Sequence, residues 1–179
     1  GMRDIQKQIK DSKAFYFPYV EESKGVGDKL LFELSKDAAV VITDDYPTYF
    51  VPQMTAEAKG NINTTYELVD SNGILPIRIA EKEYVRAHDF RRFMHKNIED
   101  FLVEFPVEKP LDYLNIQFDP KLLESFTQKY KLEDFNEINI QKFLDNLSVD
   151  KSVEVSEVVG GYNAAKSRLD YFTKKGFND

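Results

Sequence analysis

The chain has 179 residues, and its 31 acidic and 24 basic side chains give a formal net charge of -7. With 42% hydrophobic and 31% charged residues, it has the composition of a globular protein with one domain, or one domain and an appendage. The sequence has no apolar run long enough to span a membrane, and without cysteine it forms no disulfides or thiolate metal sites. The negative net charge argues against a protein that binds nucleic acid mainly through the electrostatic field of the whole chain. A cytoplasmic location is expected.

The first 70 residues alternate between helical and extended patterns. Helices are predicted at residues 2–11 and 28–36, and a third within the segment 48–60, with Pro52 as a candidate first residue and Gly60 just past its end. Strands are predicted at residues 13–20, 38–42 and 64–69, and residues 21–27 form a turn. Helices between successive strands indicate a parallel sheet, so the predicted fold class is α/β, a Rossmann-like doubly wound parallel sheet.

The remaining residues carry mainly helical patterns. A short extended piece at 74–79, interrupted by Pro76, precedes a long amphipathic helix predicted at 81–101. The two prolines within 105–110 indicate a linker. Further helices are predicted at residues 120–130, 138–147 and 162–175. The predicted organisation is therefore an α/β domain at 2–105, followed by a helical extension at 106–179.

The stretch from Ala38 to Pro47 holds the candidate site. Its apolar run without polar alternation indicates a strand buried on both faces, and the run breaks into Asp44, Asp45, Tyr46 and Pro47. Ligands gather outside the carboxyl ends of strands in open α/β sheets, which favours a binding site at these four residues. The alternative is that Asp44 or Asp45 only caps the segment that follows.

A locally basic segment lies within the predicted long helix. Arg86, Arg91, Arg92 and Lys96 outnumber Asp89 there. Such a face either contacts phosphates or is a solvated surface that pairs with acidic groups of this protein or a neighbour, and the net charge favours the second interpretation.

Other chemical signatures are weak. His88 and His95 are seven residues apart, near one helical face with Glu99, whereas a metal site calls for closer spacing. The sequence contains no Gly-x-Ser-x-Gly nucleophile motif and no glycine-rich phosphate loop after a predicted strand.

Several stretches together resemble the DNA photolyase and cryptochrome family, in particular its bacterial photolyase-related branch. They occur in the family's order over most of the chain: Val40–Pro47 with Phe50 and Pro52–Met54; Val69–Pro76; Tyr84, Ala87 and Phe90–Phe93; and Gly160–Gly161, Ala164–Ala165, Leu169 and Phe172.

The resemblance implies a two-domain parent protein. Its amino-terminal α/β domain holds a light-harvesting antenna chromophore, which is a deazaflavin, a folate or a flavin. Its helical domain binds FAD and repairs pyrimidine dimers as a deoxyribodipyrimidine photo-lyase. On this resemblance, the antenna pocket includes Asp44, Asp45, Tyr46 and Pro47.

The chain also departs from the family pattern. It lacks the family's opening strand, its arginine-bearing loop and the helical FAD domain. The chain is therefore expected to be non-catalytic and to bind no cofactor by itself. Its expected partners are a second copy, bound through the unpaired sheet edge, and a separate FAD-domain polypeptide; DNA is implied only by the resemblance, and no membrane is expected. The alternative function is a non-enzymatic binding or oligomerisation module on a Rossmann-like scaffold.

Overall fold

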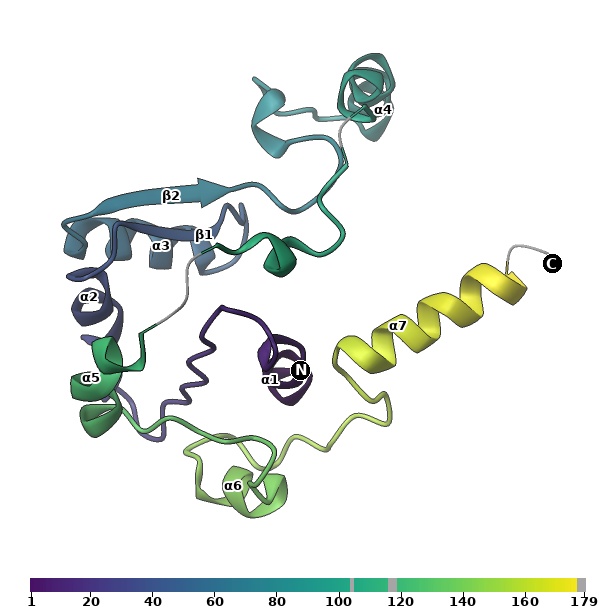
Figure 1. Cartoon of the computed structure of the whole chain (residues 1–179). Helices are drawn as coiled ribbons and strands as arrows, with labels where there is room; N and C mark the ends of the chain where they lie inside the picture. Colours follow the sequence, from purple (N-terminus) through teal and green to yellow (C-terminus); the bar gives the residue numbers. More distant parts are fainter. Residues whose placement is uncertain (104, 116–118, 177–179) are drawn as a thin grey trace. The chain divides into compact units, whose positions relative to one another are not determined.

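The structure is a computed structural model that describes residues 1–103, 105–115 and 119–176 (Figure 1). The chain divides into two compact units: the first combines Gly1–Gly27 with Lys109–Asp179, and the second is Asp28–Glu108. The predicted boundary at 105/106 lies near the end of the second unit, but the first 27 residues pack with the carboxyl-terminal segment. The assignment of two domains at 2–105 and 106–179 stays a prediction.

Helices and strands alternate in the first part of the chain, and helices follow. In chain order they are α1 (Met2–Ile9), α2 (Leu30–Ser35), β1 (Val40–Asp44), α3 (Val51–Asn61), β2 (Thr65–Val69), α4 (Ala87–Asn97), α5 (Glu124–Lys129), α6 (Ile140–Asn146) and α7 (Tyr162–Tyr171). Short 3-10 turns lie at Ile77–Ile79, Ile98–Phe101, Pro110–Tyr113 and Pro120–Leu123, and a π turn at Phe172–Gly176 follows α7. The predicted mixed α/β class is confirmed.

A small parallel sheet is the centre of the second unit. β1 and β2 pair from Val40 opposite Thr65 to Asp44 opposite Val69. α3 connects the two strands and runs along the sheet (Figure 1). The hydroxyl of Thr64 donates to the carbonyls of Ala38 and Ala39, at 3.0 and 3.1 Å, and so fixes the start of the pair. The predicted parallel pairing through a crossover helix is confirmed; within the described residues the sheet has two strands.

The prediction that the first of these strands is buried on both faces is wrong. Val40 is 40% exposed and Ile42 is 60% exposed. Their side chains share one face, because alternate residues of a strand point the same way. By the register of the pair, this face also carries Asp44, Thr65, Glu67 and Val69, and all six residues are exposed, so the face stays open.

The strand predicted at residues 13–20 is also wrong, because this segment is irregular. Pro18 is fully buried, and its carbonyl accepts a hydrogen bond of 3.0 Å from the Glu133 backbone amide. The ring of Tyr19 meets that of Tyr130 edge-on, with centroids 5.9 Å apart. The aromatic residues that suggested a strand are thus held by side-chain packing and not by a β ladder.

The predicted helices are present, with shorter bounds. α4 begins at Ala87 and not at residue 81, because residues 81–86 are irregular and Arg86 is extended (φ -113°, ψ 131°). Gly60 lies inside α3 and not beyond its end, and Pro52 is the second residue of that helix. Pro52 fits there because the first turn of a helix needs no amide donor from it.

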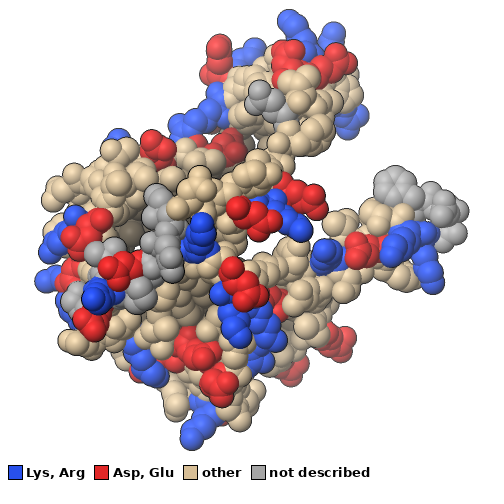
Figure 2. All heavy atoms as spheres, viewed as in Figure 1, with Lys and Arg blue, Asp and Glu red and all other residues tan. Residues whose placement is uncertain are grey.

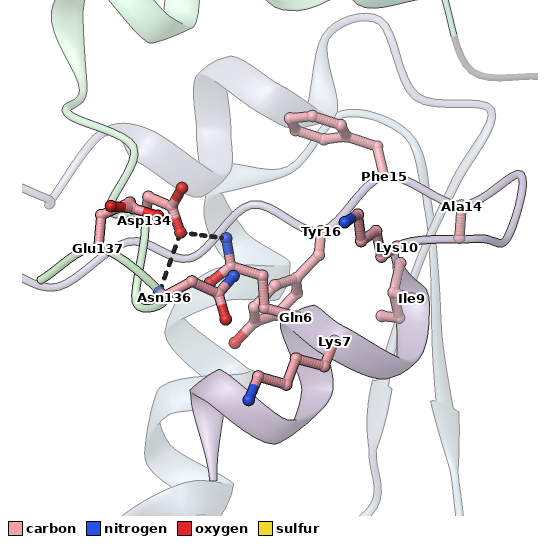
Figure 3. Close-up of a pocket in the computed structure, with 10 residues that line it drawn as sticks. All are labelled: Gln6, Lys7, Ile9, Lys10, Ala14, Phe15, Tyr16, Asp134, Asn136 and Glu137. Atoms are coloured by element: carbon pink, nitrogen blue, oxygen red, sulfur yellow. Dashed lines mark hydrogen bonds between the residues drawn. The ribbon is translucent and has the colours of Figure 1, made fainter.

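The first unit is held by contacts between α1 and the segment around Phe135. The side-chain oxygen of Gln6 accepts from the Phe135 amide at 3.0 Å. Its side-chain nitrogen donates to the Asp134 carboxylate at 3.0 Å, as Figure 3 shows. The Arg3 guanidinium donates to the carbonyls of Phe135 and Ile138. The polar side of α1 therefore satisfies the backbone of a segment about 130 residues away, and Phe135 is buried at 6% exposure.

Acidic and basic side chains are intermingled over the face shown in Figure 2. Among the described residues, no helix is both long and apolar enough to cross a membrane.

Candidate ligand-binding site at the carboxyl end of β1

Hydrogen bonds tie the end of β1 to the turn that follows β2. The Asp45 amide donates to the carbonyl of Val69 at 2.8 Å, which extends the ladder by one residue. The Asn72 side chain donates to the carbonyl of Asp45 at 2.8 Å, and the Ser71 hydroxyl donates to the Asp44 carboxylate at 2.7 Å. The backbone at the site is therefore fixed on both strands.

Asp45 forms an ion pair with Arg78. Both carboxylate oxygens accept from the guanidinium, one from Nε and the other from Nη2 at 2.8 Å. The Asp45 side chain is 16% exposed and that of Arg78 is 71% exposed. The hydrogen bond from Arg78 holds the pKa of the Asp45 carboxyl below its usual value, and the same bond raises the pKa of Arg78.

A third side chain, Asp70, shapes the turn that carries Arg78. One of its oxygens accepts from the Ile77 amide at 2.6 Å, and the other accepts from the Asn72 amide at 3.2 Å. The bond from the Ile77 amide is the main reason that the pKa of Asp70 is lowered. The Asp70 carboxylate thus positions the residue directly before Arg78.

A cavity of about 470 Å³ opens beside this ion pair. Residues from β2, from α3, from the segment after β1 and from the segment after β2 line it: Asp45, Tyr46, Pro47, Pro52, Thr55, Leu68, Ile77, Arg78 and Ala80. Its volume lies within the range of about 300–1,000 Å³ for small-molecule sites. The walls are mainly apolar, and the Asp45–Arg78 pair supplies the charged groups.

The structure brings three of the four predicted site residues to this cavity. Asp45, Tyr46 and Pro47 line it, whereas Asp44 is bonded to Ser71. Neither aspartate caps α3, whose N-cap is Phe50 without a side-chain cap. The structure therefore does not show the alternative role of these aspartates as caps of α3. That they bind a ligand stays a prediction.

Arg78 is the site residue that the sequence patterns did not indicate. It is 33 positions from Asp45, and only the turn after β2 brings the two together. The available signal was weak: an arginine between two isoleucines, shortly after Asp70 and Pro76.

Metal ligation gains no support at the described residues. No group of three or more His, Asp or Glu side chains among them has the geometry to hold a metal ion. His88 and His95 are both exposed on α4.

Comparisons with known proteins add no relative. No protein-family model matches the chain, and no curated protein or solved structure is significantly similar to it.

A second cavity, of about 560 Å³, lies in the first unit between α1 and the loop at Asp134–Glu137 (Figure 3). Its central polar groups already bond to each other, because Asp134 accepts from Gln6 and from the Asn136 amide at 3.0 Å each. These bonds join two segments of the unit. We therefore place the candidate site at β1, where the guanidinium of Arg78 retains N–H donors beyond those used by Asp45.

The Asp45–Arg78 pair predicts a specific acid response. A carboxyl whose pKa is lowered by folding stabilises the protein fully above its unfolded pKa of about 3.9, and this stabilisation is lost as the pH falls through the folded pKa. Asp45→Asn is therefore expected to unfold at a lower temperature than the wild type at pH 7, and the difference should shrink below pH 4. Thermal melts followed by circular dichroism at several pH values measure it. A difference between the two proteins that stays constant down to pH 2 would contradict the prediction.

Proposed function

We propose that this chain is a photolyase-related α/β domain that binds a planar, light-absorbing chromophore at the carboxyl end of β1 and serves light-dependent DNA repair as a binding component. The sequence alone predicted no cofactor for this chain by itself, and the observation that leads us to propose a bound chromophore instead is the cavity beside the Asp45–Arg78 pair. It lies where α/β sheets place their ligands, and four residues of the first resembling block line it: Asp45, Tyr46, Pro47 and Pro52.

The lining fits a flat heteroaromatic ring with carbonyl groups on its edge. Pro47, Pro52 and Leu68 offer apolar walls, and the ring of Tyr46 is 41% exposed and free to stack. Arg78 uses two of its N–H groups on Asp45 and has others to donate to ring carbonyl oxygens. A deazaflavin, a flavin and the pterin ring of a folate all have such an edge.

The same groups favour binding over catalysis. A general base works best with a pKa near the operating pH, whereas the pKa of Asp45 lies below its usual value and both of its oxygens are engaged by Arg78. Thr55 donates its hydroxyl to the α3 backbone and is not poised as a nucleophile. The proposal assigns no reaction step to these side chains.

The finer architecture and the partners belong to the same proposal. β1, α3 and β2 form one parallel strand–helix–strand unit, which is the repeating element of a doubly wound sheet. We assign the flavin chemistry to a separate FAD-domain polypeptide, as the resemblance implies.

The experiment is a visible absorption titration of the purified protein with FAD, a deazaflavin and a folate. At least one of them is expected to bind with a shifted band, and Asp45→Ala should weaken this binding at least tenfold, because it frees Arg78 from its fixed orientation. Asp37→Ala is the matched control: it removes the same charge at the other end of β1, at an exposed residue outside the cavity, and should leave binding unchanged.

Unshifted spectra with all three compounds would overturn the chromophore proposal. They would favour the second candidate, a non-enzymatic oligomerisation module. The observation behind that candidate is the open face of the sheet, where the apolar side chains of Val40, Ile42 and Val69 are 40%, 60% and 48% exposed. Dynamic light scattering on the same samples distinguishes a dimer from a monomer.

A further inference from the structure

The basic side chains of α4 gather on one side of the helix. Arg91, Arg92 and Lys96 lie there with His88 and His95, and all five are exposed. Two rows with a spacing of four residues run along this side: one is His88, Arg92 and Lys96, and the other is Arg91 and His95. We call these five residues the basic face.

Aromatic contacts anchor the opposite side of α4. The Tyr84 ring lies 5.6 Å from that of Phe90 and 5.2 Å from that of Phe93, measured between centroids. Phe90 and Phe93 are 6.3 Å apart. The Asn97 side chain donates to the carbonyl of Phe93 at 2.7 Å. These contacts place Tyr84 against the opposite side of α4, where Phe90 stays 42% exposed, while all five residues of the basic face are exposed.

The basic face has no acidic partner in the described part of the chain. Arg91, Arg92 and Lys96 form no ion pair with any described carboxylate, although the chain carries a net charge of -7. Pairing with this protein's own acidic groups was one interpretation of the basic segment, and the structure does not show it. Three exposed cations on one face repel each other, and a bound anion would relieve this repulsion. The anion would not have to displace an ion pair with a described carboxylate.

The charges around the basic face limit the length of the anion. Asp89 lies in the first turn of α4 itself, Glu81 and Glu83 precede the helix, Glu99 and Asp100 follow it, and all five are exposed. Figure 2 shows Asp and Glu side chains beside Lys and Arg side chains in this part of the molecule. The eleven residues of α4 span about 16 Å, so a long uniform polyanion would meet repulsive carboxylates at both ends.

We propose that the basic face of α4 docks a short acidic helix of a partner protein, with carboxylates at a spacing of four residues. Side chains four apart on a helix are about 5–6 Å apart, so two such rows match each other in register. The forked guanidinium groups of Arg91 and Arg92 suit bidentate bonds to carboxylates. The exposed carboxylates around the basic face argue against an extended anionic lipid surface as the partner. This inference is independent of the chromophore proposal.

The test uses a fluorescein-labelled helical peptide in which glutamate recurs at every fourth position, with anisotropy measured at low ionic strength. The wild-type chain is expected to bind it at least tenfold more tightly than a scrambled peptide of the same composition. Arg91→Gln with Arg92→Gln should weaken binding at least tenfold, and Arg91→Lys with Arg92→Lys should give an intermediate loss, because the charge stays but the fork is removed.

The matched control is Lys142→Gln with Lys166→Gln, which removes two charges from exposed positions on α6 and α7 and should leave peptide binding unchanged. Equal binding by the wild type and the Arg91→Gln/Arg92→Gln variant, with matching circular dichroism spectra, would overturn the proposal. Equal binding of the scrambled peptide would do the same, as would tighter binding of a short DNA duplex or of anionic phosphatidylserine vesicles.

Discussion

Replacing Phe135 with alanine is expected to lower the free energy of unfolding by about 3–5 kcal/mol, the usual cost of deleting a buried phenylalanine ring. Phe135 is 6% exposed, and its ring meets that of Phe143 edge-on, with centroids 6.0 Å apart. Its backbone is fixed by Gln6 and Arg3, so the surrounding atoms have little freedom to fill the cavity. Urea unfolding followed by circular dichroism measures the loss.

Phe105→Ala is the control for this prediction. It deletes the same ring at a position that is 77% exposed and should change stability by less than about 0.5 kcal/mol. If both variants lose the same stability, Phe135 is not a core residue and the contact between α1 and the Phe135 segment is wrong.

The second large effect is expected at Gly161, which precedes α7. Its φ of 110° and ψ of 166° place it in a region that is essentially restricted to glycine and costs other residues about 1–3 kcal/mol. A Cβ there would lie 2.6 Å from the Asp4 carboxylate and 3.0 Å from the amino-terminal nitrogen. Asp4 accepts from the Asn163 backbone and side chain at 3.3 and 3.1 Å, and these bonds must break if it moves. Gly161→Ala should therefore destabilise the first unit by about 3 kcal/mol, the upper end of that range.

The adjacent glycine provides the control. A Cβ at Gly160 meets nothing within 4 Å, and its φ is not in the left-handed region, so Gly160→Ala should have little effect on the urea midpoint. A Gly161→Ala protein as stable as the wild type would show that the turn before α7 and its contact with Asp4 are placed incorrectly.

Local sequence patterns predicted the elements whose stability is local. The β-branched run at Val40–Ile42 and the helix after Pro52 needed only neighbouring residues to be recognised, and both formed. The segment at residues 13–20 looked like a strand because its aromatic residues favour extended backbone. Its conformation depends on Pro18 and Tyr19 packing against residues beyond 125, which no local pattern encodes.

The candidate site shows the same division. The sequence predicted that Asp45, Tyr46 and Pro47 lie at the carboxyl end of a strand, because an apolar run typical of a strand precedes them. Arg78 could not be placed, because its distance from Asp45 is set by the Asp70 turn and by the parallel register of β1 and β2. The sequence pattern therefore indicates the residues that directly follow β1, but not Arg78, which reaches them only through the pairing of β1 with β2.

The discontinuity of the first unit has a consequence during synthesis. Residues 28–108 emerge from the ribosome as one stretch and have all of their unit's partners at hand. α1 can make its contacts only after Phe135 is synthesised, 132 positions after Arg3. At translation rates of about 5–20 residues per second, synthesis of this stretch takes roughly ten seconds. During this interval Pro18 and Tyr19 lack their partners Glu133 and Tyr130. The nascent chain therefore carries an unsatisfied aromatic segment at residues 15–19, which is the kind of sequence that chaperones bind.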